Sequence, residues 1–350
     1  AVKLNAMNHT NSTTAGLILS LFSALIALGL VVPVMAQQLP AVERLSGESS
    51  GPVVRGTWVW QEKWINTDQA QDEMLDFCGR FGFNLILIQI HNDREAQGYT
   101  IKYPAELTRL VAEAAKRGIA VEALDGANDM AFAANQPKTL EMLDALIDLN
   151  QSMPEGARFT GVHYDIEPYT SDRWKAGQAE RDAVMAELLD FYVKARQKLN
   201  DRGSKMTLAC DIPMWYDAKT AENDHCIVTF NGERKNLHEH IQDLCDYIGI
   251  MSYRRFAVGK NSVTYHVQNE MGYADGVGRG VCAGVETGKT TADPTESATI
   301  SFYGIPSDVF WSEVGKVHET FKDRPAYRGV LIHCYARFQE YLADNPPKGE

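Results

Sequence analysis

The sequence predicts a (β/α)8 TIM barrel, forming a single domain after an N-terminal signal peptide. About eight apolar segments alternate with segments of helical periodicity, and eight strand-helix units close such a barrel. The fourth apolar segment ends in two carboxylates, Asp165 and Glu167, and the C-terminal ends of barrel strands are where chemistry is placed. A doubly wound open sheet is the alternative. It usually has fewer strands and a glycine-rich turn after the first one, where this chain has residues 58–61, WVWQ.

The predicted strands share short, largely apolar sequences rich in β-branched residues. They are expected at residues 55–60, 83–91, 119–125, 160–168, 205–213, 246–253, 280–286 and 328–335. The predicted helices share apolar residues three or four positions apart, and several end just before a glycine. They are expected at residues 68–80, 107–117, 137–150, 184–202, 236–245, 265–273 and 308–321. The strict alternation of the two patterns predicts a parallel sheet.

The N-terminal region has the features of a targeting segment. Residues 17–32 form an uninterrupted apolar run, followed by small residues that suit a cut after Ala36. This pattern predicts a secretory signal peptide over residues 1–36, with Met7 as a candidate start and the residues before it as an extension. An uncleaved membrane anchor is the alternative, because the apolar run approaches the length of a membrane span. A secreted or periplasmic protein is expected.

Composition limits the choice of partners. The 350 residues are 45% hydrophobic and 23% charged, which suits a soluble enzyme with a large core. Residues 37–52 predict a linker, and residues 53–345 the barrel domain. The net charge of -12 argues against nucleic acid as a partner. No cofactor and no membrane contact after signal cleavage are predicted, and the oligomeric state is left open.

Carboxylates and aromatic residues dominate the C-terminal ends of the predicted strands. The candidate site residues there are Trp58, Trp60, His91, Asn92, Asp125, His163, Asp165, Glu167, Asp211, Trp215, Tyr253, Arg254, Glu286, His333 and Tyr335. Aromatic faces suit sugar rings, and paired carboxylates supply the acid and base for cleaving a glycosidic bond. In the fourth strand, alternation directs His163, Asp165 and Glu167 to one face. The set predicts an exported glycoside hydrolase that acts on a polysaccharide or oligosaccharide.

Two of these segments resemble family-18 glycoside hydrolases, the chitinase-like barrels. Residues 160–168 resemble the fourth-strand motif D-G-x-D-x-D-x-E, and residues 251–253 resemble the sixth-strand M-x-Y. The resemblance implies that Glu167 is the general acid, that Asp165 orients and charges a substrate acetamide, and that Tyr253 donates a hydrogen bond to it. The chain departs from the pattern at Thr160 and His163, which replace aspartates. It also departs at Arg254, where an Asp usually follows the Tyr, and Tyr335 is expected in place of the usual eighth-strand Trp.

A second, weaker resemblance is to the clan-A retaining glycosidases, which often carry Glu-Pro at the fourth strand and Glu at the end of the seventh. Glu167 with Pro168 and Glu286 match those two positions. This resemblance implies that Glu286 is a nucleophile. The two resemblances agree on Glu167 and disagree on the group that attacks the anomeric carbon.

Two other functions stay open at the level of sequence. A carbohydrate-binding barrel without catalysis is one, because of the departures at Thr160, His163 and Arg254. A metal-assisted hydrolase or deacetylase is the other, with ligands drawn from His91, His163, Asp165 and His333, although no paired-His motif supports it and no metal site is predicted. Five of the six cysteines fall within predicted strands or helices, which favours buried packing over disulfides.

Overall fold

The computed structural model describes residues 53–95, 98–217, 225–289 and 299–346. The predicted signal peptide and linker, residues 1–36 and 37–52, lie outside these described ranges. Within the described ranges, no helix has both the length and the apolar character needed to cross a membrane.

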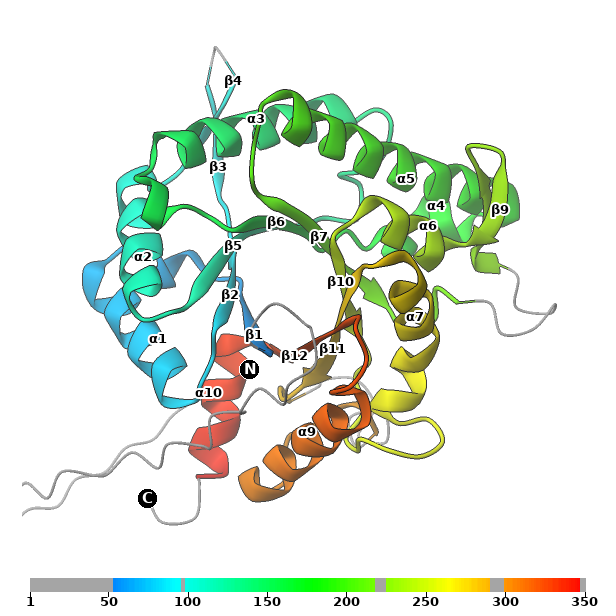
Figure 1. Cartoon of the computed structure of the whole chain (residues 1–350). Coiled ribbons are helices and arrows are strands. Elements are labelled where there is room, and N and C mark those ends of the chain that lie inside the picture. Colours follow the sequence, from blue (N-terminus) through cyan, green and yellow to red (C-terminus); the bar gives the residue numbers. More distant parts are fainter. Residues whose placement is uncertain (1–52, 96–97, 218–224, 290–298, 347–350) are drawn as a thin grey trace, which may run out of the picture. The chain divides into compact units, whose positions relative to one another are not determined.

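Eight parallel strands form a closed barrel, which confirms the predicted fold (Figure 1). Around the barrel the order is β1, β12, β11, β10, β7, β6, β5 and β2. Their bounds are β1 Val54–Val59, β2 Leu85–Gln89, β5 Ala120–Asp125, β6 Gly161–Tyr164, β7 Thr207–Pro213, β10 Tyr247–Met251, β11 Gly280–Glu286 and β12 Tyr327–His333. All eight neighbouring pairs are parallel, so the C-terminal ends of the strands meet at one end of the barrel.

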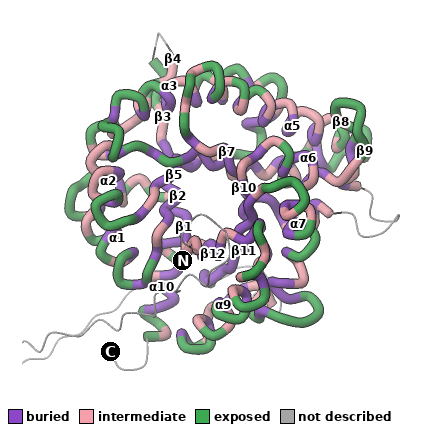
Figure 2. The backbone as a smooth tube through the Cα atoms, in the orientation of Figure 1, coloured by how far each residue is buried: buried purple, intermediate pink, exposed green. Residues whose placement is uncertain are grey.

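Helices surround the barrel and pair with its strands (Figure 1). The longer ones are α1 Asp68–Arg80, α2 Pro104–Lys116, α3 Gln136–Ser152, α5 Gln178–Asp201, α6 Leu237–Leu244, α7 Val263–Val277, α9 Ser307–Phe321 and α10 Tyr335–Asp344. Short helical turns are η1 Glu62–Trp64, η2 Glu155–Ala157, η3 Pro168–Thr170 and α4 Asp172–Lys175. Figure 2 shows buried backbone along the strands and exposed backbone on the outer side of the helices.

Two antiparallel hairpins interrupt the strand-helix alternation, and the sequence did not predict them. One pairs β3 Asn92–Glu95 with β4 Gly98–Ile101, and the other pairs β8 Ile227–Phe230 with β9 Glu233–Asn236. β3 and β9 consist mostly of charged residues that are exposed or half-buried, so they lack the apolar pattern that indicates a buried strand.

The barrel strands divide their side chains between two environments. Outward side chains such as Val162, Tyr164 and Ile166 join the large core between strands and helices. Inward side chains form a small second cluster that includes Trp58, Leu87 and Leu331. This alternation confirms that Val162, Tyr164 and Ile166 face the opposite side from His163.

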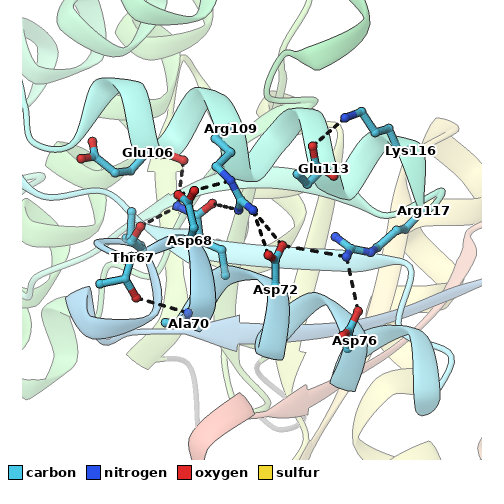
Figure 3. Close-up of polar contacts among 12 residues, drawn as sticks. Thr67, Asp68, Ala70, Asp72, Asp76, Glu106, Arg109, Glu113, Lys116 and Arg117 are labelled. Carbon is cyan, nitrogen blue, oxygen red and sulfur yellow. Dashed lines mark hydrogen bonds and ion pairs between the residues drawn. The ribbon is translucent and has the colours of Figure 1, made fainter.

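A network of ion pairs joins α1 to α2 on the outside of the barrel (Figure 3). Arg109 of α2 contacts both carboxylate oxygens of Asp72, at 3.0 and 2.9 Å, and lies 3.2 Å from Asp68. It also donates to the buried Gln71, whose amide reaches the carbonyls of Ile65 and Glu106. Arg109 therefore links an exposed charge network to a buried amide.

All six cysteines are free and buried, which confirms the prediction of buried packing for the five that fall within predicted strands or helices. Cys210 of β7 and Cys245 lie with their sulfur atoms 3.9 Å apart. Burial raises the pKa of Cys78 and Cys282 to about 12, so these thiols stay protonated at neutral pH.

Candidate active site

The predicted fourth strand ends earlier than residue 168. Regular pairing stops at Tyr164, although the amide of Asp165 still donates to the carbonyl of Asp125 at 2.9 Å. Glu167 then precedes Pro168, which occupies the first position of η3. A proline fixes its own backbone and favours an extended residue before it, so the chain turns immediately after Glu167. This turn holds Glu167 at the C-terminal end of the barrel.

The hydroxyl of Tyr169 donates a hydrogen bond to Oε1 of Glu167. Tyr169 is itself held by aromatic contacts, with its ring 5.0 Å from that of Trp215 and 6.2 Å from that of Tyr216. Burial and the nearby charge of Glu167 raise the pKa of Tyr169, so it stays a donor. Sequence reasoning missed Tyr169, and the Glu-Pro-Tyr order of residues 167–169 was the available signal, because the turn at proline brings the ring back over the carboxylate.

Asp165 is half-buried next to other carboxylates, and its Oδ1 atom is shielded from solvent. Burial, followed by the negative charges of Asp211 and Glu167, raises its pKa well above the ordinary value, while His163 acts in the opposite direction. Its Oδ1 atom has no hydrogen-bond partner among the described residues. A half-buried carboxyl group with a raised pKa and a free oxygen is suited to bind a substrate group that supplies a donor.

Tyr253 lies just beyond β10, which ends at Met251 and not at residue 253 as predicted. Its phenol lies near the carboxylates of the site. Burial raises the pKa of its phenol, and so do the charges of Glu286, Asp211, Asp165 and Glu167. The ring stacks on His333, with centroids 5.6 Å apart. The structure therefore brings Tyr253 together with Asp165 and Glu167, and the phenol remains a hydrogen-bond donor.

Glu286 ends β11 and is held by three donors. Its Oε2 lies 2.8 Å from Nδ1 of His333 and 2.8 Å from Nη1 of Arg337, and its Oε1 accepts from the amide of Gly288 at 2.5 Å. Burial alone would raise the pKa of Glu286, but the contacts with His333, Gly288 and Arg337 lower it. Arg337, in the first turn of α10, is a site residue that sequence reasoning missed, since helical residues were not considered.

Three predicted substrate-binding residues, His163, Asp211 and Trp58, are buried inside the barrel. His163 is fully buried, and its ring nitrogens lie 3.0 Å from Asp211 and 3.1 Å from the hydroxyl of Tyr247. Asp211 is 3% exposed and accepts a 2.6 Å hydrogen bond from the indole of Trp58, which is 2% exposed. Each side chain faces the barrel interior below the strand ends and has almost no exposed surface. At Gly249 of β10 an added Cβ would overlap the carboxylate of Asp211, so the absence of a side chain makes room for it.

Arg254 and Tyr335 are two further residues that were predicted to bind the substrate. Arg254 donates to Asn261 at 3.0 Å and to the carbonyl of Tyr253 at 2.7 Å, so it braces the loop after β10. Tyr335 belongs to α10, because β12 ends at His333, and its buried ring packs against Trp64 with centroids 4.9 Å apart. The residue that ends the eighth strand at the site is therefore His333.

Asp125, Asn92 and His91 do not join the central carboxylates. Leu124 faces the barrel interior, so Asp125 faces the helices, where it lines a cavity of about 20 Å³ with Asn92 and Tyr164. Burial raises the pKa of Asp125 to about 6. His91 lies near the charges of Glu62 and Lys102, and burial lowers the pKa of its imidazole. Asp125 points away from the barrel interior because side chains alternate along the strand and Leu124 points inward. Asn92 lies outside the central group because it begins β3 of the first hairpin.

Trp60 and Trp215 keep partial exposure at the site. Trp60 packs on the inner cluster that contains Trp58, and Trp215 packs against Tyr169. They are the two predicted tryptophans that remain available to a sugar ring.

The residues proposed as metal ligands do not converge. His163 is enclosed by Glu122, Tyr247 and Asp211, and His91 lies beside Glu62 and Lys102. Among the residues that the structure describes, no group of three or more His, Cys, Asp or Glu side chains could hold a metal ion.

A cavity of about 600 Å³ lies at the opposite end of the barrel, and sequence reasoning did not anticipate it. It is lined by N-terminal strand residues that include Glu122, Thr207 and Arg328. The N-terminal face of a barrel usually serves stability, so this cavity is not placed in the active site.

Comparison with known proteins supports the fold. No protein-family model matches the sequence, and no curated protein matches it. The barrel is similar to a calcium-binding mutant of Bacteroides uniformis beta-glucuronidase 2, with 13% identity over 81% of this chain and 30% of that chain and a TM-score of 0.50. It is also similar to a chitinase from Bacteroides thetaiotaomicron, with 12% identity over 81% of this chain and 90% of that chain and a TM-score of 0.49. A third similar structure is the spore cortex-lytic enzyme SleL of Bacillus cereus, with 11% identity over 84% of this chain and 74% of that chain and a TM-score of 0.48. At these identities the likeness is one of fold, and it is the fold that both sequence resemblances imply.

Proposed function

We propose that this protein is a glycoside hydrolase that acts on a polysaccharide or oligosaccharide, with Glu167 as general acid and Asp165 assisting. One observation carries the proposal. At the C-terminal end of β6, Glu167 accepts a hydrogen bond from Tyr169 beside the half-buried Asp165, whose pKa is raised. Two neighbouring carboxyl groups in different environments are the arrangement that glycosidic bond cleavage requires.

In the proposed reaction Glu167 transfers its proton to the glycosidic oxygen as the bond to the anomeric carbon breaks. The carbonyl oxygen of the substrate's acetamide attacks the anomeric carbon and forms a cyclic oxazolinium ion. Asp165 orients the acetamide nitrogen, and Tyr253 donates to the acetamide oxygen. Glu167 then takes a proton from the water that opens the ring, which regenerates the acid and retains the configuration of the sugar.

The contacts of Glu286 favour this scheme over direct attack by a carboxylate. Both oxygens of Glu286 already accept hydrogen bonds, from His333 and Arg337 on one and from Gly288 on the other. Donors that stabilise a carboxylate lower its nucleophilicity. In the proposed scheme Glu286 instead fixes His333, which stacks on Tyr253.

A panel of glycans that includes amino-sugar polymers tests the proposal through the release of new reducing ends. Wild-type protein should release them from at least one glycan, and Glu167→Gln should not, because the amide has nearly the same shape and no transferable proton. Glu340→Gln is the matched control, since Glu340 is exposed on α10. Binding without new reducing ends would favour the carbohydrate-binding barrel without catalysis, and activity of Glu167→Gln equal to wild type would exclude the proposed acid.

Export belongs to the same proposal. The predicted signal peptide of residues 1–36 would be removed, leaving the linker of residues 37–52 and a barrel domain of residues 53–345 to act outside the cytoplasm. Mass spectrometry of the protein recovered from cell fractions should find an N-terminus at Gln37. An intact N-terminus in the membrane fraction would instead indicate an anchor.

A further inference from the structure

A chain of polar contacts crosses the interior of the barrel below the site, and the proposed mechanism does not use it. Tyr247 donates to Glu122 at 2.5 Å and lies 3.1 Å from Nδ1 of His163. Nε2 of His163 lies 3.0 Å from Oδ2 of Asp211, which also accepts from the indole of Trp58. All five side chains are at most 3% exposed. Buried polar groups are costly unless they are paired, so this arrangement requires a specific set of charges.

The donors and acceptors around His163 define its charge. The proton of the Tyr247 hydroxyl is directed to Glu122, so its oxygen presents a lone pair to Nδ1 of His163. Nε2 faces a carboxylate oxygen of Asp211, as an ion pair rather than a well-aligned hydrogen bond. Both ring nitrogens therefore face acceptors, and an imidazole with two N–H groups is an imidazolium.

We propose that His163 is a fixed imidazolium that pairs with Asp211 and thereby sets the proton state of Asp165 at the site. His163 touches no substrate, so it is a positioning residue. The proposal rests on the glycoside hydrolase function and names a residue on which the role of Asp165 depends.

The charged and titratable groups that face His163 come from three other strands and from its own. They are Glu122 of β5, Asp211 and Cys210 of β7, Tyr247 of β10 and, on its own segment, Asp165. Burial alone would lower the pKa of His163, but Asp211 and Glu122 raise it to about 10. The imidazolium therefore stays charged through the neutral range. Asp165 then lies beside the negative charges of Asp211 and Glu167, which favour its protonated form.

The substitution His163→Gln tests the positioning role, because it removes the charge and keeps a polar side chain. We expect kcat to fall on the order of 10²-fold with little change in KM, since the residue is buried beneath the substrate. The acid limb of the activity profile should move up by about 1 to 3 pH units, because the carboxylates lose the positive charge that favours their ionised forms. An unchanged profile would overturn the proposal.

The double variant Glu122→Gln/His163→Gln separates positioning from folding. It replaces Glu122 and His163 together by neutral side chains, so thermal stability should recover relative to His163→Gln alone. The shift of the acid limb of the activity profile should remain. Recovery of the wild-type profile would mean that His163 serves stability only. Tyr341→Phe, which removes a hydroxyl of a buried side chain of α10 that donates to the carbonyl of Ile305, is the matched control and should leave the profile unchanged.

Nitrogen-15 NMR of histidine-labelled protein tests the fixed charge without any turnover. The resonances that disappear in His163→Gln should show both ring nitrogens protonated from about pH 5 to 9, whereas ordinary histidines titrate near 6.5. Titration of these resonances near neutral pH would overturn the proposal. Because this measurement needs no substrate, a failed glycan assay and a failed imidazolium assignment are separate results.

Discussion

Tyr169 donates its hydroxyl proton to Oε1 of Glu167, two residues before it in the chain. The contact exists because Pro168 turns the backbone immediately after the end of the barrel strand. Trp215, from the segment after β7, supports the Tyr169 ring from the side. The general acid is therefore oriented by a residue of its own turn and by the neighbouring strand-helix unit.

The substitution Tyr169→Phe should lower kcat about tenfold and leave KM nearly unchanged, because it removes the donor that orients Glu167 and keeps the ring. Steady-state kinetics on the glycan identified by the panel measures this. Tyr216→Phe is the control, since the Tyr216 hydroxyl is buried nearby and has no hydrogen-bond partner in the described part of the structure. A similar loss in both variants would mean that the hydrogen bond from Tyr169 to Glu167 is not responsible for the loss.

The network between α1 and α2 predicts that Arg109 contributes more to the stability of the fold than Arg117 does (Figure 3). Arg109→Ala should lower the free energy of unfolding by about 1 to 2 kcal/mol, because it removes a two-oxygen contact with Asp72 and leaves the buried Gln71 without its donor. Arg117→Ala should cost about 0.5 kcal/mol or less, because its contacts with Asp72 and Asp76 are long and exposed. Urea denaturation measures both values. Equal losses would show that Gln71 does not depend on Arg109.

The contacts of Glu286 are expected to make the stability of the fold sensitive to acid. Its pKa is lowered in the folded protein from the ordinary 4.5, so its contacts stabilise the fold fully above that value and are lost as the pH falls through the folded pKa. Wild-type protein should therefore lose more stability than Glu286→Gln between about pH 5 and pH 3. Thermal unfolding followed across this range compares the two proteins. Parallel curves would mean that the pairs with His333 and Arg337 contribute little.

Periodicity in the sequence was sufficient to predict the barrel. The strands are buried and apolar, and the helices carry regular apolar faces, so both patterns are set by the same core. The ends of elements were harder to predict. The eighth strand ends at His333, two residues before Tyr335, and that shift moves Tyr335 from the site into α10. Chain reversal at a strand end depends on contacts with other elements, which no local pattern records.

Glu167, Asp165 and Tyr253 were proposed because their spacing matches a motif and alternation fixes their direction, and their roles stay predictions. Depth within the barrel was not predictable from the sequence, so His163 and Asp211 were assigned to the substrate although both side chains are buried inside the barrel. Glu122 and Tyr247, which complete the inner network, come from strands whose central residues resemble ordinary core positions. Charge pairing between strands is a tertiary property, and a single sequence does not show it.

The choice between the two catalytic schemes can be made by comparing Asp165→Asn with Glu286→Gln. If the acetamide of the substrate attacks, Asp165→Asn should reduce kcat on an N-acetylated substrate on the order of 10²-fold or more, because the support for the acetamide is lost. Glu286→Gln should then act more weakly and mainly on KM, through the movement of His333 and Tyr253. If Glu286 attacks directly, it must lie about 5 Å from Glu167, and a fluorosugar inhibitor should label it.

The measurement is kcat and KM for both variants on an N-acetylated substrate and on its non-acetylated counterpart. The acetamide scheme requires that wild-type protein cleave only the N-acetylated substrate, because the nucleophile belongs to the substrate. The buried and unpartnered Oδ1 of Asp165 and the three donors already bound to Glu286 both favour this result. Cleavage of the non-acetylated substrate, with kcat lost only in Glu286→Gln, would instead identify Glu286 as the nucleophile.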